Sequence, residues 1–467
     1  METPLSTGSD EAAIQTFKAG LRGGLLRPGD DHYETARRVW NGMIDRKPAL
    51  IARCAGVADV ITAVNFARTH HLLVSVRGGG HNVTGNAVCE GGLMIDLSPM
   101  KGMCVDPVRR TARAQAGLTW GEFDHETQAF GLAVTGGQIS TTGIAGLTLG
   151  GGQGWLMRTC GLVVDNLLSV DLVTADGRLL IASATENEDL FWGVRGGGGN
   201  FGIATSFEYR LHPIGPIMLG GMVLYPASQA KELLRFYREY MRGAPDELMV
   251  LVGFLTAPPA PFVPAHLHGT PMVAMVVCYA GSIEEGQRVV EAARAFGSPA
   301  LDLISPMPYT AVQQLFDAAM PFGHQVYLKS DYLAGLSDEL INTLVTHTAA
   351  MTSPLSTVVL LPCGGAVSRV KEQDTAFGHR DAAYYCAIFS IWTDPLESEQ
   401  HIQWARDFWT AMQPFSVGVY VNELGDEGED RIRAAYPPTT YKRLVALKNK
   451  YDPTNFFRLN QNIKPTM

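Results

Sequence analysis

The segment with the clearest chemical potential reads Arg-Gly-Gly-Gly-His-Asn at residues 77–82 and follows an apolar, strand-like run at residues 72–76. Three consecutive glycines have no Cβ, so their N–H groups can turn inward and surround a pyrophosphate. His81 would then lie beside whatever the pyrophosphate carries. A surface turn with a stray histidine is the alternative, and this motif alone does not separate the two.

Glycine is unusually frequent: 50 of the 467 residues, about 11% against a usual ~7%. The glycines cluster within the first 215 residues, at 78–80, 91–92, 136–137, 150–152 and 196–199. They show no fixed period, so low complexity explains them poorly. We therefore expect several loops whose backbone closely approaches a ligand.

The composition is that of a globular protein, with 46% hydrophobic residues and a net charge of −9. Lysine and arginine form no blocks, so we expect no nucleic-acid partner. Residues 1–7 lack the basic start and apolar core of an export signal, and no apolar run approaches the ~18 residues of a membrane helix. The seven cysteines are widely spread without a Cys-x-x-Cys pair. We expect a cytoplasmic protein without membrane association, whose oligomeric state stays open.

The first half of the chain mixes strands and helices around the glycine loops. A helix at residues 57–67 precedes the strand at 72–76, and further strands are expected at 93–97 and 111–116. A second helix begins after Thr119, with Glu122 completing a capping box, and ends at Gly131. Residues 171–180 form a hairpin around Asp-Gly.

The pattern changes near residues 213–216, after which glycine becomes rarer. Strands at 272–279, 357–361 and 384–392 alternate with helices at 228–242, 283–296 and 337–351, and a Pro-rich loop covers 257–264. This predicts an α+β fold with an antiparallel sheet. The ending at 451–462 is rich in hydrogen-bonding side chains, so we expect it to fold back onto the first domain. The expected units are 1–215 (core about 45–215), 216–417 and 418–467.

Two other motifs do not support a site. Residues 197–202 match G-x-G-x-x-G, but a helix-like segment precedes them and a strand-like segment follows, the reverse of a Rossmann phosphate loop. His266 and His268 could bind a metal, yet no carboxylate lies at a sequence spacing typical of a metal site. We predict neither a nicotinamide cofactor nor a metal.

Five motifs, which follow one another in the same order, resemble those of the bacterial berberine-bridge-enzyme-like flavoproteins, a family of the vanillyl-alcohol-oxidase or PCMH type. They are the segments 77–82, 150–156, 161–166, 189–202 and 452–462, and the resemblance spans nearly the whole chain. Five motifs in the same order are far more specific than one glycine loop.

The resemblance implies a PCMH-type FAD-binding domain of two α/β subdomains, and a substrate domain whose antiparallel sheet is covered by helices. In this family the histidine of the glycine motif forms the 8α bond to the flavin, which transfers to His81. The implied FAD-binding residues are His81, Arg77, Gly78, Gly79, Gly80, Asn82, Gly137, Thr141, Thr142, Gly143, Gly146, Gly152, Ile203, Asn460 and Asn462.

Many family members carry a second flavin bond from a cysteine in a Cys-Pro-Thr-Val stretch. The aligned residues 139–142 read Ile-Ser-Thr-Thr and contain no thiol, so one covalent bond is expected. Cys160 stands near this loop in sequence but lies beyond the glycines at 150–152.

The implied activity is that of an oxidase, which removes hydride from a C–H next to oxygen or nitrogen of a small organic or secondary-metabolite substrate and reduces O2 to H2O2. A dehydrogenase with another electron acceptor is one alternative, and a flavin-carrying binding protein without turnover is another. The family oxidises alcohols, sugars, amines and polyketide-like compounds, so the fold does not identify the substrate.

Residues 420–423 read Tyr-Val-Asn-Glu and align with a Tyr-x-Asn-Tyr segment of plant relatives, whose last tyrosine acts as the base. Glu423 is therefore the expected base, with Tyr420 and Tyr384 next in order. The alternative is that Glu423 only pairs with a nearby Arg or Lys. Thr142 aligns with the position that controls oxygen access to the flavin.

Overall fold

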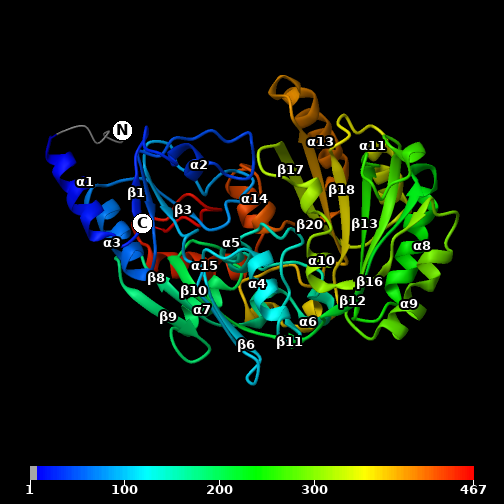
Figure 1. Ribbon diagram of the computed structural model, residues 1–467, viewed down its shortest axis with the longest axis horizontal. Helices are drawn as coiled ribbons and strands as arrows, with labels where there is room; N and C mark the ends of the chain where they lie inside the picture. Colours follow the sequence, from blue (N-terminus) through cyan, green and yellow to red (C-terminus); the bar gives the residue numbers. More distant parts are fainter. Residues whose placement is uncertain (1–7, 467) are drawn as a thin grey trace.

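The structure is a computed structural model that describes residues 8–466; residues 1–7, on which the expectation of an unexported protein rests, lie outside them. Two lobes stand side by side (Figure 1). One contains most of the first 215 residues together with the end of the chain. The other contains a large sheet with helices on its outer side.

The first lobe is built on two sheets. Within the described residues, one has four strands in the order β1 (Gly24–Leu26), β2 (Leu50–Arg53), β4 (Leu93–Asp96) and β3 (Val74–Arg77). The other has five strands in the order β5 (Met103–Asp106), β6 (Thr111–Gln115), β10 (Ile203–Arg210), β8 (Leu167–Val173) and β9 (Leu179–Ser183). The strands β2, β3 and β4 are parallel, and β3 delivers the chain to the glycines at 78–80.

Among the helices of this lobe, those at 57–69, 120–128 and 188–194 were expected from the sequence, and the others were not. The bounds of the helices are α1 (Gly8–Gly20), α2 (Tyr33–Arg37), α3 (Val57–Thr69), α4 (Trp120–Gln128), α5 (Ile144–Leu149), α6 (Met157–Cys160) and α7 (Glu188–Val194). Thr119 and Glu122 form the expected capping box at the start of α4. The Asp-Gly turn joins β8 and β9 as the expected antiparallel hairpin.

The second lobe is built on one antiparallel sheet. Among the described residues it has nine strands: β15 (Leu301–Asp302), β12 (Ile217–Pro226), β14 (Pro271–Tyr279), β13 (Leu248–Thr256), β18 (Thr357–Pro362), β19 (Tyr384–Trp392), β17 (Gln325–Leu333) and β20 (Ser416–Gly418) in order, with β16 (Ser305–Pro308) on β12. The expected α+β class and antiparallel sheet are confirmed.

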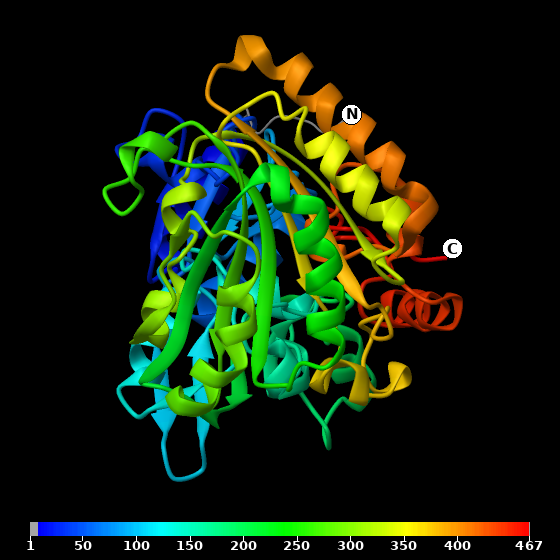
Figure 2. The same ribbon diagram turned by 90° about the vertical axis from the view of Figure 1, so that its right-hand side faces the viewer.

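The two faces of this sheet are covered differently. One face packs under the helices α8 (Ala230–Arg242), α9 (Ile283–Ala295), α11 (Asp338–Thr348) and α13 (Ser398–Met412), which lie in front of it in Figure 2. The other face is turned toward the first lobe, and α10 (Tyr309–Gln313) contacts α4 there.

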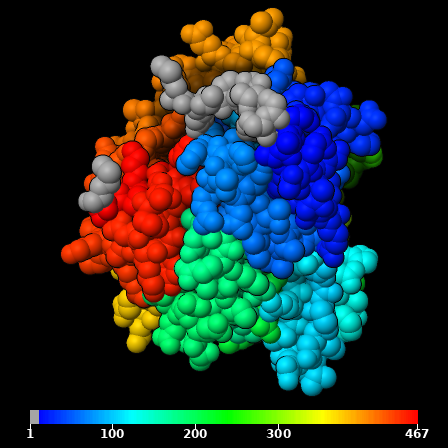
Figure 3. Space-filling view, turned by 90° about the vertical axis from the view of Figure 1, so that its left-hand side faces the viewer, coloured from blue at the N-terminus to red at the C-terminus, as the bar shows by residue number. Residues whose placement is uncertain are grey.

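The end of the chain joins the core of the first lobe. Beyond the sheet it forms α14 (Glu429–Ala434) and α15 (Pro438–Tyr451), and neither helix was expected from the sequence. Leu444, Phe457 and Ile463 pack in the same hydrophobic core as β8 and β10. Figure 3 shows this red segment beside the blue and green surface of the first lobe.

Candidate functional site

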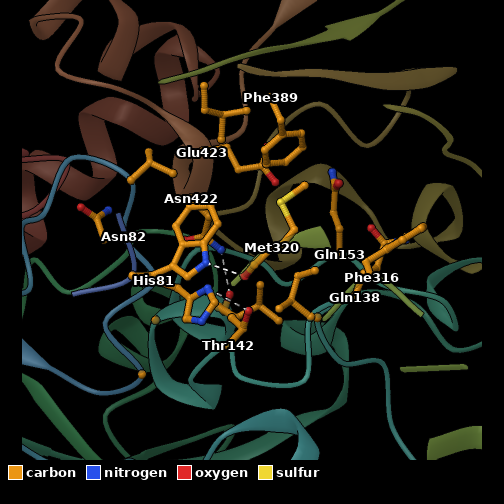
Figure 4. Close-up of a pocket in the computed structure, with 18 of the residues that line it drawn as sticks. His81, Asn82, Gln138, Thr142, Gln153, Phe316, Met320, Phe389, Asn422 and Glu423 are labelled. Atoms are coloured by element: carbon orange, nitrogen blue, oxygen red, sulfur yellow. Dashed lines mark hydrogen bonds between the residues drawn. The ribbon is translucent and has the colours of Figure 1, made fainter. Parts of the chain in front are cut away.

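A cavity of about 660 Å³ lies between the two lobes and the end of the chain. The first lobe contributes the glycines at 78–80 and 197–199, the second lobe contributes one face of the large sheet, and the tail contributes residues 459–461. Figure 4 shows His81 and Thr142 across the cavity from Glu423 and Phe389. Segments far apart in sequence therefore form one site.

The glycine loop at 78–80 packs directly against the loop that holds Gly143. A Cβ on Gly79 would lie 2.2 Å from the Gly143 backbone nitrogen, so neither position tolerates a side chain. Gly80 has a φ of +74°, a conformation that favours glycine. These glycines line the cavity, which leaves its wall there formed by backbone.

The same wall fits a polar cofactor with a phosphate bridge. The positions where a Cβ would stand on Gly146 and Gly199 are open, with no atom within 4 Å, and both glycines line the cavity. The buried Asn460 Oδ1 and Gln138 Nε2 atoms, also at the cavity, have no hydrogen-bond partner among the described residues. An acceptor and a donor are thus available to a bound group.

His81 sits in a largely aromatic environment. Its ring stacks on Trp40 at a centroid distance of 5.2 Å and meets the edge of Phe322 at 5.3 Å. Its Nε2 and Nδ1 atoms lie 2.9 Å and 3.5 Å from the hydroxyl oxygens of Thr141 and Thr142. Burial lowers the His81 pKa to about 4, because the charged ring loses its hydration. The imidazole is therefore neutral at pH 7 and keeps a lone pair for bonding.

Glu423 ends the short 3-10 helix η8 (Val421–Glu423) and faces the cavity. Its Oε2 atom accepts a hydrogen bond from the Tyr385 hydroxyl, and it makes no salt bridge with any described residue. Burial raises the Glu423 pKa to about 7. The alternative of an Arg or Lys partner thus has no support in this geometry, and the carboxyl can take up a proton near neutral pH.

Tyr420 also lines the cavity, but its hydroxyl is already engaged. It accepts hydrogen bonds from the Gly152 N–H at 2.9 Å and from Asn422 Nδ2 at 2.8 Å. Burial raises the Tyr420 pKa above its usual value, which makes the phenolate scarcer at neutral pH. This geometry suits a positioning group better than a base.

The structure places two of the expected site residues, Tyr384 and Gly152, outside the lining of the cavity. Tyr384 packs against Tyr237 in the helix-covered core, with the rings tilted at 46° and a centroid distance of 5.9 Å, so it is placed away from the cavity. Side chains alternate along β19, and the neighbouring Tyr385 faces the cavity instead. Gly152 does not line the cavity either, and its N–H donates to the hydroxyl of Tyr420.

Three further expected residues do not line the cavity. Arg77 donates to the Ala36 carbonyl, and Thr141 reaches the site only through His81. Asn462 is half-buried beside the lining residue Gln461. The other expected residues line the cavity: His81, Gly78, Gly79, Gly80, Asn82, Gly137, Thr142, Gly143, Gly146, Ile203, Asn460, Tyr420 and Glu423.

Several lining residues were not expected from the sequence: Trp40, Gln138, Gln153, Met320, Tyr385 and Phe389. Strand alternation could have grouped Tyr385 with Phe389, but it does not tell which face meets the cavity. The glycines at 197–199, whose flanking elements argue against a Rossmann loop, also line the cavity. No cysteine among the described residues does, and burial raises the Cys160 pKa to about 12.

Comparisons with known proteins agree with this geometry. A family model for an FAD binding domain matches residues 48–183, and a model described as berberine and berberine like matches residues 419–464. The first match contains His81 and the glycines at 78–80 and 143, and the second contains Glu423. Among residues 8–466, every helix is too short or too polar to span a bilayer.

The chain aligns with curated relatives over their whole length. An FAD-linked oxidoreductase of Dictyostelium discoideum is 32% identical, covering 100% of this chain and 99% of the relative. The (R)-6-hydroxynicotine oxidase of Paenarthrobacter nicotinovorans is 29% identical, covering 95% and 97%. A crystal structure of 6-hydroxy-D-nicotine oxidase from Arthrobacter nicotinovorans has a TM-score of 0.85 at 28% identity, covering 100% of both chains. The chain thus belongs to the berberine-bridge-enzyme-like family of FAD-dependent oxidoreductases.

Proposed function

We propose that this protein is an oxidase whose FAD is bonded to His81 and whose base is Glu423. When bound, FAD would accept a hydride from a substrate C–H next to oxygen or nitrogen and pass the electrons to O2, with H2O2 as product. The observation that carries the proposal is the Glu423 carboxyl, which meets the cavity with Tyr385 as its hydrogen-bond donor.

The first wall of the cavity would hold the cofactor. The glycines at 78–80 and Gly143 would present backbone to the pyrophosphate, and Asn460 and Gln138 would offer an acceptor and a donor. The neutral His81 ring, stacked on Trp40, would supply the nitrogen for a single covalent bond.

Glu423 would act on the substrate from the other wall. Loss of hydride leaves a positive charge on carbon unless the attached O–H or N–H gives up its proton. The Glu423 carboxylate would accept that proton, and the Tyr385 hydrogen bond would fix its orientation. With a pKa near 7, the carboxylate can both accept the proton and release it between turnovers.

The test is the rate of anaerobic flavin reduction by an accepted substrate, measured against pH. Because only the ionised carboxyl accepts a proton, the wild-type rate should rise with pH through about 7. Glu423→Gln should bind FAD normally, lose this pH dependence and slow reduction on the order of 10²-fold.

Glu429→Gln, an exposed carboxyl on the same segment, is the matched control and should behave like wild type. Reduction of Glu423→Gln at the wild-type rate would assign the base to another group.

A further inference from the structure

The large sheet presents ordered rows of side chains to the cavity. In the strand register, Leu251, Leu361 and Tyr385 stand in one row beside Glu423, and Leu255, Thr357 and Phe389 stand in another, four residues along each strand. At ~3.3 Å per residue, the two rows are about 13 Å apart. The sheet thus forms a long wall that leads away from Glu423.

The row between them is built from small side chains. Gly253 pairs with Ala274 on one side and Val359 on the other, and all three line the cavity. A Cβ on Gly253 would meet only Leu251, at 3.7 Å, so the sheet itself does not require glycine here. The small row leaves a trough across the wall.

The trough is nearly free of charge. Among the residues that the structure describes, Glu423 is the one acidic side chain of the cavity, and no lysine or arginine lines it. The wall around the trough is mostly aliphatic or aromatic, including Met222, Leu224, Val276, Leu328 and Phe389. Such a wall offers few partners to the many hydroxyls of a sugar, whose burial without hydrogen bonds is costly.

The far end of the trough reaches solvent through an apolar rim. Phe262, in the Pro-rich loop after β13, is 53% exposed, and Leu355, just before β18, is 42% exposed; both line the cavity. Because β13 and β18 are paired antiparallel, these loops meet at the same edge of the sheet. The route from solvent to Glu423 is therefore largely apolar, with hydroxyl side chains such as Thr357 near its outer end.

We propose that the substrate is an extended lipophilic alcohol or amine, uncharged along its body, with its one reacting O–H or N–H at Glu423 and its apolar tail in the trough toward Phe262 and Leu355. This proposal rests on the proposed function for the position of the reacting end. The tail site stands on the strand register, the small row and the rim.

Binding can be measured apart from the reaction with 4-alkylbenzamides of increasing tail length, which carry no oxidisable C–H next to oxygen or nitrogen. Titration of the holoenzyme, followed by the flavin absorbance change, should give a Kd that falls about fourfold per added methylene until the tail reaches the rim. A Kd independent of tail length, or tighter binding of cellobiose than of any benzamide, would overturn the proposal.

Variants of the wall locate the tail. Gly253→Val should weaken binding of the long-tailed benzamides at least tenfold and leave unsubstituted benzamide within twofold. Gly24→Val, an exposed strand glycine with equally open space outside the cavity, is the control and should match wild type.

Phe262→Asp keeps the test decisive if Gly253→Val does not fold. Phe262→Asp should reduce the gain in affinity per added methylene for the longest tails. Leu396→Asp, at a 92% exposed apolar residue outside the cavity, should leave that gain unchanged. Wild-type tail dependence in both cavity variants contradicts the trough. Because the benzamides do not react, that failure is separate from a failure of Glu423→Gln.

Discussion

At the scale of single residues, we propose that His81 holds the flavin through a covalent bond. Its ring is neutral and faces the cavity between Trp40 and two threonine hydroxyls. Acid precipitation of wild type should give a yellow pellet, because a covalent bond keeps the flavin with the denatured chain. His81→Ala should release its flavin to the supernatant or lose it on purification.

Cys160→Ala is the matched control and should keep its flavin in the pellet, since Cys160 does not line the cavity. A covalent flavin in His81→Ala, or a colourless wild-type pellet, would contradict the tether.

The size of the Thr142 side chain is expected to affect how O2 reaches the flavin. Thr142 lines the cavity beside His81, and the family resemblance predicts that it controls oxygen access to the flavin. Thr142→Leu adds volume there, so we expect slower reoxidation of the reduced flavin by O2 and nearly unchanged reduction by substrate. Stopped-flow measurement of the two half-reactions checks this. Unaltered reoxidation would contradict a role of Thr142 in oxygen access.

At the scale of elements, α4 and α10 join the two lobes through a buried pair. Gln313 Nε2 donates to Asp124 Oδ2 at 2.8 Å, and burial raises the Asp124 pKa to about 7. The folded pKa lies above the unfolded value of ~3.9, so this group's stabilisation is complete below pH ~4 and is lost as pH rises through 7.

Asp124→Asn cannot ionise at this position. The unfolding free energy of the variant relative to that of wild type should therefore rise by about 2–3 kcal/mol from pH 5 to pH 8. Urea unfolding at the two pH values measures the difference. Asp381→Asn, at an exposed carboxyl, should show no such change. Equal pH dependence in Asp124→Asn and wild type would mean that Asp124 titrates normally.

At the scale of the whole molecule, the end of the chain completes the first lobe and one wall of the cavity. Lys448 is fully buried and donates to Asp452 at 2.7 Å, to the Asn200 carbonyl at 3.0 Å and to the Phe457 carbonyl at 2.8 Å. One ammonium thus joins α15, the tail and the glycine loop near 199.

Lys448→Met leaves the Asp452 charge buried without its cation, so it should cost about 3–5 kcal/mol of unfolding free energy and weaken FAD retention. Lys450→Met breaks an exposed pair with Asp189 and should cost about 0.2–1 kcal/mol. Denaturant unfolding, with flavin release as a second readout, compares the two variants. Similar losses of unfolding free energy in both would show that the buried pair does not hold the tail.

The sequence was sufficient for what depends on near neighbours in the chain. The capping box at Thr119 and Glu122, the Asp-Gly hairpin and the strand leading to the glycines at 78–80 each need only adjacent residues, and each has the expected form. The five ordered motifs were sufficient for the family and its FAD, because a cofactor wall made of backbone requires glycines at particular positions.

The tertiary structure decided which side chains meet in the cavity. Tyr384 and Tyr385 are neighbours of the same type, and only the packing of α8 on one sheet face turns Tyr385 toward Glu423. The trough at Gly253 exists because the strand register aligns it with Ala274 and Val359. The pairing of β12, β13, β14, β18 and β19 is chosen by packing between distant segments, and a shift of one residue would turn each side chain to the other face.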